Sequence, residues 1–391
     1  MADRRSKLLK SLPTQPFVGL AEEVAAVEAS GKTVIRLGQG TPDLPTPAPI
    51  CEALERALTD PATHQYGPFR GQKRLKEAVA AFYQREYGVE LDPEKEVAIL
   101  IGSKSGLITL PQCLLEPGEG ILLPNPGYPD YISGARLAGA DIIDLTLKED
   151  RGYLPDYTTL DPLHARLMYL NYPSNPTGAV ATPAFFEETV EFAAKHDLMV
   201  VHDFAYGSIG FDGHVPPSFL QADGAKEIGI EVYTMSKAFN MSGWRVAFAV
   251  GNADIIEAIN TYQDHVHVSV FSAIQEAAIV ALESPRDLRD DLASLYETRR
   301  NRLIDGLRRA GWEIEAPKGS FFVWAKVPEG DAKSFSSKLL QEAGVAVTPG
   351  YFFGTEGEHH IRFGLVSSEQ KIDEAVERIE RLFAAYEEIH Q

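Results

Sequence analysis

Cysteine is scarce in this chain: Cys51 and Cys113 are its two cysteines among 391 residues. Two thiols are too few for a disulfide framework or a thiolate metal site. Both lie among apolar residues in stretches with a helical pattern, so we expect free, buried thiols and no bound metal. No apolar run approaches the roughly 20 residues of a membrane-spanning helix, and no apolar signal segment follows the charged N-terminus. We therefore expect no membrane partner and a cytoplasmic location.

Positive charge is also in deficit. Lysine and arginine number 37 against 56 aspartates and glutamates, which gives a net charge of −19. Such a surface repels nucleic acid and anionic lipid, so we expect neither as a partner. The length suits two or three domains, and a hydrophobic fraction of 44% is ordinary for a globular protein with a large core.

Short apolar runs alternate with helical patterns over the first two thirds of the chain. The predicted strands are 97–101, 120–123, 141–145, 167–170, 198–202, 231–234 and 246–250. Helical stretches lie between several of them, such as 183–195 with Thr182 as its cap. This alternation predicts an α/β fold with a mostly parallel sheet covered on both faces. Ligands of such sheets gather at the carboxyl ends of the strands.

The pattern changes after residue 252. A long helical region is predicted over 253–282 and another over 288–310. The last part mixes strands with helices, which predicts a second, smaller α+β domain; its predicted strands are 320–325, 345–347 and 360–365, and its helices 335–343 and 369–386. We divide the chain into an N-terminal segment that packs with the small domain (1–45), a large domain (46–285) and the small domain (286–391).

The segment YTMSKAFNMSGWR at 233–245 places Lys237 directly after an apolar strand. A lysine at a strand end inside a pocket loses its proton through desolvation and nearby cations, which makes it a nucleophile toward aldehydes. Arg245, eight residues on, suits a bidentate grip on phosphate. The alternative interpretation is a solvated loop lysine.

In VVHDFAY at 200–206, Asp203 ends a fully apolar strand. A carboxylate there calls for a cationic partner, such as a pyridinium nitrogen that the carboxylate keeps protonated. Tyr206, three residues on, and Asn175 in the loop NYPSNPTG at 171–178 are candidates to hold the 3-oxygen of the same ring. The alternatives are a helix-capping aspartate beside a structural tyrosine, and an ordinary proline-stiffened turn.

Two further segments suit a planar phosphorylated ligand. In IGSKSG at 101–106, small residues let backbone N–H groups and the hydroxyls of Ser103 and Ser105 approach a phosphate at a helix N-terminus. In PGYP at 126–129, Tyr128 offers a stacking face. Taken singly, the first is also typical of any glycine-rich turn and the second of a core aromatic.

In combination and order, these motifs resemble those of the fold-type I pyridoxal-phosphate-dependent aminotransferases, the aspartate aminotransferase superfamily, from about residue 37 to 365. The resemblance implies a seven-stranded large domain with a smaller α+β domain, and pyridoxal phosphate as cofactor. It makes Lys237 the Schiff-base lysine and general base. Asp203 would pair with the ring nitrogen, and Asn175 and Tyr206 with the 3-oxygen. The other implied cofactor contacts are Ser103, Lys104, Ser236 and Arg245 at the phosphate and Tyr128 on the ring.

The resemblance assigns the substrate residues and a partner subunit as well. Arg362 in HIRF matches the arginine that clamps the substrate α-carboxylate, although its pattern alone suits a solvated strand face. Gly40 in LGQGTPD would lie beside that carboxylate, as would Asn175. Tyr66 in HQYGPFR matches a tyrosine lent to the neighbouring subunit's phosphate, which implies a homodimer with shared active sites. One departure is Ala247, where many relatives carry glycine.

The substrates implied are amino acids and 2-oxo acids. Residues 37–47, 125–131, 201–212 and 241–252 are most similar to a Bacillus-type subgroup that aminates apolar 2-oxo acids. Those acids include 4-methylthio-2-oxobutanoate and aromatic ones, with glutamine- or glutamate-type donors. An LL-diaminopimelate or aspartate aminotransferase, or a carbon–sulfur lyase, remains an alternative. Lys104 could face a distal carboxylate instead of phosphate, and Phe17, Tyr131 and Phe271 are candidates for an apolar pocket or for core.

Overall fold

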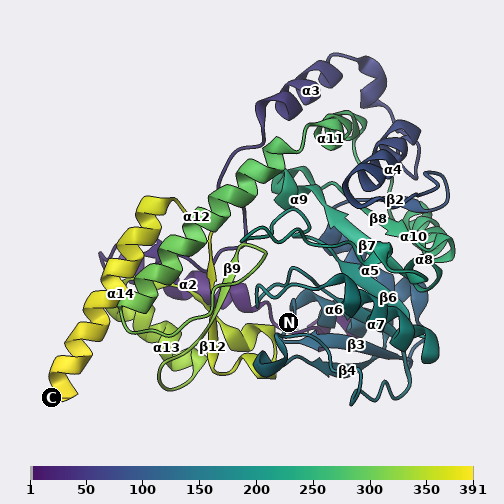
Figure 1. The fold of residues 1–391 in the computed structure, drawn as a ribbon. Coiled ribbons are helices and arrows are strands. Elements are labelled where there is room, and N and C mark those ends of the chain that lie inside the picture. The colour runs from purple at the N-terminus through teal and green to yellow at the C-terminus, as the bar shows by residue number, and fades with distance from the viewer. Residues whose placement is uncertain (1–2, 391) are drawn as a thin grey trace.

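Seven strands form one sheet in the order β2-β8-β7-β6-β5-β3-β4 (Figure 1) in the computed structural model, which describes residues 3–390. β8 runs antiparallel to both its neighbours, and the other adjacent pairs are parallel. The predicted strands and the mostly parallel α/β fold are confirmed. The observed bounds are Val97–Leu100 (β2), Gly120–Asn125 (β3), Asp141–Thr146 (β4), Ala165–Leu170 (β5), Met199–Asp203 (β6), Gly229–Thr234 (β7) and Ala247–Gly251 (β8).

Helices cover both faces of this sheet, as its buried strands require. Alternate residues of β2 point to opposite faces: Ala98 and Leu100 pack with one set of helices, whereas Val97 and Ile99 pack with the other. The first set is α5 (Ser103–Leu114), α6 (Asp130–Ala138) and α10 (Ala253–Val266). The second is α3 (Ala48–Leu58), α4 (Lys73–Tyr87), α7 (Pro183–Lys195) and α11 (Ser272–Glu283). The bounds of α7 and its Thr182 cap are as predicted.

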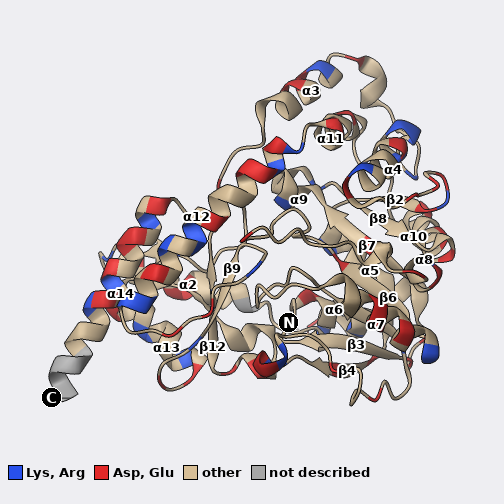
Figure 2. Cartoon of the chain, in the orientation of Figure 1, with Lys and Arg blue, Asp and Glu red and all other residues tan. Residues whose placement is uncertain are grey.

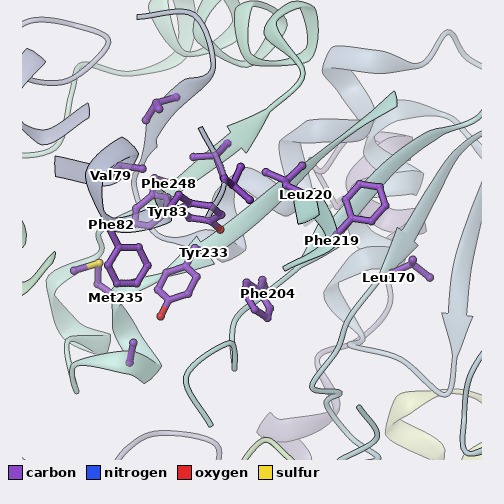
Figure 3. Close-up of a cluster of buried hydrophobic side chains, with 14 of the residues drawn as sticks. Val79, Phe82, Tyr83, Leu170, Phe204, Phe219, Leu220, Tyr233, Met235 and Phe248 are labelled. Atoms are coloured by element: carbon purple, nitrogen blue, oxygen red, sulfur yellow. The ribbon is translucent and has the colours of Figure 1, made fainter. Parts of the chain in front are cut away.

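Aromatic rings fill the second face (Figure 3). The Tyr233 and Phe248 rings stack at 5.3 Å between centroids, and Phe82 of α4 meets Tyr233 edge-on at 5.4 Å. Tyr233 belongs to β7, four residues before Lys237. This packing fixes the strand whose carboxyl end carries the lysine.

The continuous helix predicted over 253–282 is wrong. α10 ends at Val266, His267 is extended, and α11 begins at Ser272. The intervening segment alternates valine with polar residues, a pattern that favours extended backbone over helix. Gln275 Nε2 donates to the Val270 carbonyl at 2.6 Å and holds the turn into α11.

The last third of the chain forms the smaller α+β part, as predicted. Its antiparallel sheet has the order β11-β12-β9. Its elements are α12 (Asp287–Arg309), β9 (Phe322–Lys326), α13 (Ala332–Lys338) with a following π turn (Leu339–Ala343), β10 (Val345–Ala346), β11 (Thr348–Pro349), β12 (His360–Gly364) and α14 (Glu369–His390). The short helices elsewhere are α1 (Lys7–Ser11), α8 (Ala225–Ile228) and α9 (Met235–Ala238).

The N-terminal segment lies against this smaller part. β1 (Ile35–Arg36) pairs in parallel with β10. α2 (Pro16–Ala29) buries Val24 and Val27 against Leu340 and Ala346. The contacts hold α2 at the junction between the two sheets.

Charged side chains of both signs are interspersed along α12 and α14 (Figure 2), with pairs such as Arg302–Asp373 at 2.7 Å. Cys51 and Cys113 are free, but the prediction that they are buried is wrong: each is partly exposed on its helix. Within residues 3–390 no helix is long and apolar enough to cross a membrane. The same range contains no group of three acidic, histidine or cysteine side chains placed to hold a metal ion.

Candidate active site

A cavity of about 650 Å³ lies at the carboxyl ends of the parallel strands, between the large sheet and β12. The predicted site residues come together there, Tyr66 excepted, although they span positions 40 to 362; the cavity is lined by Gly40, Ser103, Lys104, Tyr128, Asn175, Asp203, Tyr206, Ser236, Lys237, Arg245 and Arg362. Tyr66 is 86% exposed and lies outside the cavity of its own chain.

Lys237 sits on α9, which begins directly after β7. Thr234 at the strand end caps this short helix by accepting from the Ser236 N–H at 3.2 Å. Lys237 Nζ donates to the Gly40 carbonyl at 2.5 Å. Burial, with the positive charges of Arg362 and Arg245, lowers the pKa of Lys237 from 10.5 to about 8, and Asp203 opposes this only in part.

That lowered pKa has a measurable consequence. We expect the apoprotein to capture an aldehyde at Lys237 faster as pH rises from 7 through about 8, and then to level off, because only the neutral amine attacks. An ordinary lysine would keep gaining up to its pKa of about 10.4. Stopped-flow absorbance with pyridoxal phosphate measures this rate. A rate that climbs without a plateau to pH 10 would contradict the burial of this amine.

Asp203 ends β6 and is 6% exposed. Its Oδ2 accepts from the Tyr131 hydroxyl at 2.6 Å, whereas its buried Oδ1 has no hydrogen-bond partner among the described residues. Burial raises the pKa of Asp203 to about 6, although the Tyr131 hydrogen bond and the charges of His202 and Lys237 oppose the shift. A buried, half-satisfied carboxylate at the cavity wall fits a cationic ring nitrogen.

Tyr131, a candidate for an apolar pocket or for core, belongs to the core. It is buried behind Asp203, with its ring against Tyr128 and Tyr169, because its hydroxyl needs a buried acceptor and Asp203 provides one. Its position in α6, 72 residues before Asp203, gave no local signal of this contact. The Tyr131 hydroxyl therefore stabilises the ionised form of the Asp203 carboxylate.

We expect Tyr131→Phe to raise the pKa of Asp203 and shift the acid limb of the pH–rate profile to higher pH, because the charged carboxylate loses a donor. Cofactor affinity should fall by about tenfold, the effect of one lost buried hydrogen bond. Tyr169→Phe is the matched control, since Tyr169 donates to the Leu107 carbonyl instead. If the acid limb of the pH–rate profile moved equally in both variants, the proposed effect of Tyr131 on the pKa of Asp203 would be contradicted.

Arg362 on β12 is buried, not on a solvated strand face. Its guanidinium lies over the rings of Phe322 (3.9 Å) and Phe353 (4.7 Å). Nη1 donates to Asn175 Oδ1 at 2.7 Å and Nη2 to the Gly38 carbonyl at 2.9 Å. Burial lowers the pKa of Arg362 to about 10, yet the group stays cationic at neutral pH. The arrangement suits a planar carboxylate that enters the cavity.

Gly40 lies in the same corner. A Cβ at this position would come within 3.2 Å of the Phe322 ring and 4.0 Å of Arg362 Nη2. The missing side chain therefore leaves the space in front of the guanidinium open. Tyr206 closes the neighbouring wall, with its ring edge-on to Phe322 at 5.7 Å.

A buried polar network supports the loop that carries Asn175. Glu231 of β7 accepts from Tyr83, Ser218, the Phe219 N–H and His202, at 2.7–2.8 Å. The other ring nitrogen of His202 lies 2.9 Å from the Tyr172 carbonyl. Within the loop, the Asn175 N–H donates to Asn171, whose amide donates to the Asp203 carbonyl. The network thus ties two strands to the loop.

Donors gather at the opposite end of the cavity. Ser103 begins α5, whose first turn contains no acidic residue, so its N-terminal N–H groups remain available to an anion. Ser236 and Arg245 line the same cavity. Gly102 has φ +76°, and a Cβ there would meet Arg245 Nη2 at 2.0 Å, so the close approach of the guanidinium requires glycine. The donor set fits a phosphate.

Two residues considered for that phosphate already have partners within the chain. The Ser105 hydroxyl turns back to the carbonyls of Ile101 and Gly102 at 2.7 and 2.9 Å, so its predicted phosphate contact is wrong. Lys104 Nζ pairs with Asp130 Oδ2 at 2.8 Å. A serine early in a helix readily bonds the preceding turn, and no sequence pattern marks which serine does so.

Helix α2 supplies an apolar wall that the sequence analysis missed apart from Phe17. Phe17, Leu20, Ala21 and Val24 line the cavity at helical spacing, i, i+3, i+4 and i+7. That periodicity was the available signal. Phe271, another candidate for this pocket or for core, belongs to neither: it is outside the lining and 42% exposed, because the break between α10 and α11 turns it outward.

Comparison with known proteins agrees with this geometry. The family model described as aminotransferase class I and II matches residues 32–379. The chain belongs to the class I and II aminotransferase family. A relative of this aminotransferase in Bacillus subtilis (strain 168) is the L-glutamine--4-(methylsulfanyl)-2-oxobutanoate aminotransferase. The two are 55% identical over 386 residues, which are 98% of this chain and 97% of the relative.

Two other comparisons extend the similarity. An LL-diaminopimelate aminotransferase of Halothermothrix orenii is 43% identical to this aminotransferase over 375 residues, 95% of this chain and 96% of the relative. The solved apo-BacF structure from Bacillus subtilis matches it with a TM-score of 0.94 at 48% identity, over 98% of each chain. The aminotransferase is thus a pyridoxal-phosphate-dependent enzyme of fold-type I, as the resemblance implied.

Proposed function

We propose that this aminotransferase moves an amino group from a glutamine- or glutamate-type donor to a 2-oxo acid with an apolar or aromatic side chain, such as 4-methylthio-2-oxobutanoate. The observation that carries the proposal is the apolar wall of α2, which lines the same cavity as the carboxylate site at Arg362. The name of the 55% identical relative supports the same substrates. The 43% identical LL-diaminopimelate aminotransferase supports a second candidate, with a polar side chain in place of an apolar one.

The residues present fit pyridoxal phosphate. Lys237 would hold its aldehyde carbon, Asp203 its ring nitrogen, and Asn175 and Tyr206 its 3-oxygen. Tyr128 would stack on the ring, and the phosphate would lie among Ser103, Ser236 and Arg245. Lys104, which is paired with Asp130, would face the substrate instead. The strongest sign of this fit is the orphaned Asp203 Oδ1, a buried carboxylate oxygen that lacks a partner among the described residues. The cofactor supplies an electron sink for the charge left when the α-proton is removed.

The chain's own groups would carry the proton and the orientation. Arg362, whose guanidinium carbon lies 3.9 and 4.7 Å from the ring centroids of Phe322 and Phe353, binds the substrate α-carboxylate beside the Gly40 backbone. Lys237, whose pKa of about 8 leaves its amine partly neutral at pH 7–8, would take the α-proton as general base and return it. The α2 wall covers the apolar side chain and excludes water from the reacting centre.

The exposed Tyr66 supports a homodimer in which each subunit lends this residue to its partner's phosphate. Tyr66 is absent from the lining of its own chain's cavity, so its phenol is available to a second subunit. We place the domain boundaries at 45/46 and 285/286, since the α2–β1 segment packs with the small sheet and α12 begins at Asp287. A cytoplasmic location completes the proposal.

The test is an acceptor–donor panel with the purified, cofactor-loaded protein. We expect 4-methylthio-2-oxobutanoate and phenylpyruvate to exceed oxaloacetate by at least tenfold in kcat/KM, with glutamine among the best donors. Release of pyruvate and ammonia from amino acids should stay at background, which separates transfer from lysis. A panel in which LL-diaminopimelate is the single efficient donor would reject the apolar assignment and favour the second candidate.

A further inference from the structure

Two cations line the cavity in addition to those at its carboxylate and phosphate ends, and each already has an acidic partner. Lys104 Nζ lies 2.8 Å from Asp130 Oδ2, and Arg36 Nη2 lies 2.7 Å from Glu28 Oε2. The Arg36 pair is open to solvent on both sides and is therefore screened. The Lys104 pair is the asymmetric one: the lysine side chain is half exposed toward the cavity, whereas Asp130 is buried.

Asp130 is built to stay ionised. Its Oδ1 accepts from Gln15 Nε2 at 3.0 Å, and Lys104 and Tyr128 donate to the same carboxylate. Burial alone would raise the pKa of Asp130, but these donors outweigh it and the pKa is lowered. The ionised Asp130 carboxylate therefore compensates the charge of Lys104 at neutral pH.

The pair lies beside the apolar wall. Gln15, which bonds Asp130, precedes Phe17 by two residues, and Phe17 and Lys104 line the same cavity. A substrate side chain that reaches along α2 therefore meets methyl and phenyl groups, with a compensated ion pair at the edge. A distal carboxylate there would gain Lys104 but face Asp130 directly behind it, and it would lose its own hydration. A methylthio group, a phenyl ring or a carboxamide avoids this cost.

We propose that Asp130 is a specificity-determining residue that neutralises Lys104, so that the side-chain subsite accepts uncharged substrates and rejects dicarboxylates. This inference rests on the proposed function and deepens it. It explains how the side chains of the amino donor and of the 2-oxo acid acceptor can occupy the same subsite, because the glutamine carboxamide and a thioether are both uncharged. It also sets the order glutamine above glutamate for the donor.

The experiment compares two unreactive acids, glutarate and 4-methylpentanoate, by equilibrium titration of the cofactor-loaded enzyme. Wild type should bind 4-methylpentanoate more tightly. Asp130→Asn keeps the hydrogen-bond acceptor for Gln15 but removes the charge, and we expect the affinity ratio to move about three- to tenfold toward glutarate. The kcat/KM ratio of 2-oxoglutarate to 4-methylthio-2-oxobutanoate should move in the same direction.

Two variants make the test specific. Gln15→Ala removes a hydrogen bond to Asp130 without changing charge, and it should leave the ratio where it was. Lys104→Met alone leaves Asp130 uncompensated and should push the ratio further from glutarate, which tests the proposal even if Asp130→Asn does not fold. In the double variant with Asp130→Asn and Lys104→Met, the shift of the affinity ratio toward glutarate should disappear.

The proposed role of Asp130 would be overturned by an unchanged affinity ratio in Asp130→Asn. It would also be overturned if the shift toward glutarate persisted in the double variant that lacks Lys104. The outcome is separable from the proposed function, because the binding ratio is measured with acids that cannot react. A wild-type enzyme that aminates apolar 2-oxo acids while Asp130→Asn keeps the wild-type ratio would refute the role of Asp130 alone. A wild-type enzyme that aminates none of them would refute the proposed function.

Discussion

Lys237→Ala should lose the visible absorbance of the bound cofactor and at least about a thousandfold in kcat, because one side chain would supply both the covalent anchor and the general base. The position and the lowered pKa of the Lys237 amine support this expectation. The amine is buried at the cavity centre, 2.5 Å from the Gly40 carbonyl, with a pKa of about 8. Absorbance spectra and steady-state rates of the purified variant measure the two losses.

Lys104→Ala is the matched control for this prediction, since Lys104 lines the same cavity but is paired with Asp130. That variant should keep the visible band. Added methylamine should restore part of the activity of Lys237→Ala, because a free amine can replace the missing base. Retention of both the band and turnover in Lys237→Ala would remove the basis of the proposed chemistry.

Asp203→Asn should lower kcat by about two to three orders of magnitude, the loss found when one preorganised electrostatic contact is removed from an active site. The amide can still accept from Tyr131, so the fold around it should hold, but it cannot balance a protonated ring nitrogen. Steady-state kinetics and the cofactor dissociation constant measure the effect. Thermal melting serves as the check that stability is kept.

The pH dependence of this contact has a defined sign. The pKa of Asp203 is about 6 without the cofactor, so the carboxylate is ionised above that pH and protonated below it. Cofactor affinity of the wild type should therefore fall more steeply than that of Asp203→Asn as pH decreases through about 6, because only the titrations of Lys237 and of the cofactor phosphate remain in the variant. Equal slopes in the two proteins would mean that the carboxylate does not face the ring nitrogen.

Much of the fold was predictable because its signals are local. Most strands of the large sheet are buried on both faces, so they appear in the sequence as short continuous apolar runs, whereas the edge strand β4 is largely exposed. The break at 267–271 was missed because the apolar residues on either side keep a helical period. α2 was missed because Pro13, Pro16 and Gly19 at its start are typical of a loop, although the alanines that follow favour a helix.

The residues of the candidate site also differ in whether a local sequence motif marks them. Lys237, Asp203 and Asn175 each stand in a motif that follows a strand, and parallel strands bring their carboxyl ends to one edge. Contacts between distant segments carry no such signal. Tyr131 donates a hydrogen bond to Asp203, which is 72 residues later in the sequence, and Gln15 donates one to Asp130, which is 115 residues later. The chemistry was therefore predictable from the sequence, and the residues that tune it required the structure.

Reduction with borohydride followed by peptide mass spectrometry identifies the lysine that holds the cofactor, since it fixes the cofactor to whichever amine holds it. We expect the pyridoxyl mass on the peptide containing Lys237 and not on the peptide containing Lys104. A label on any other lysine, in protein that is active before reduction, would contradict this expectation.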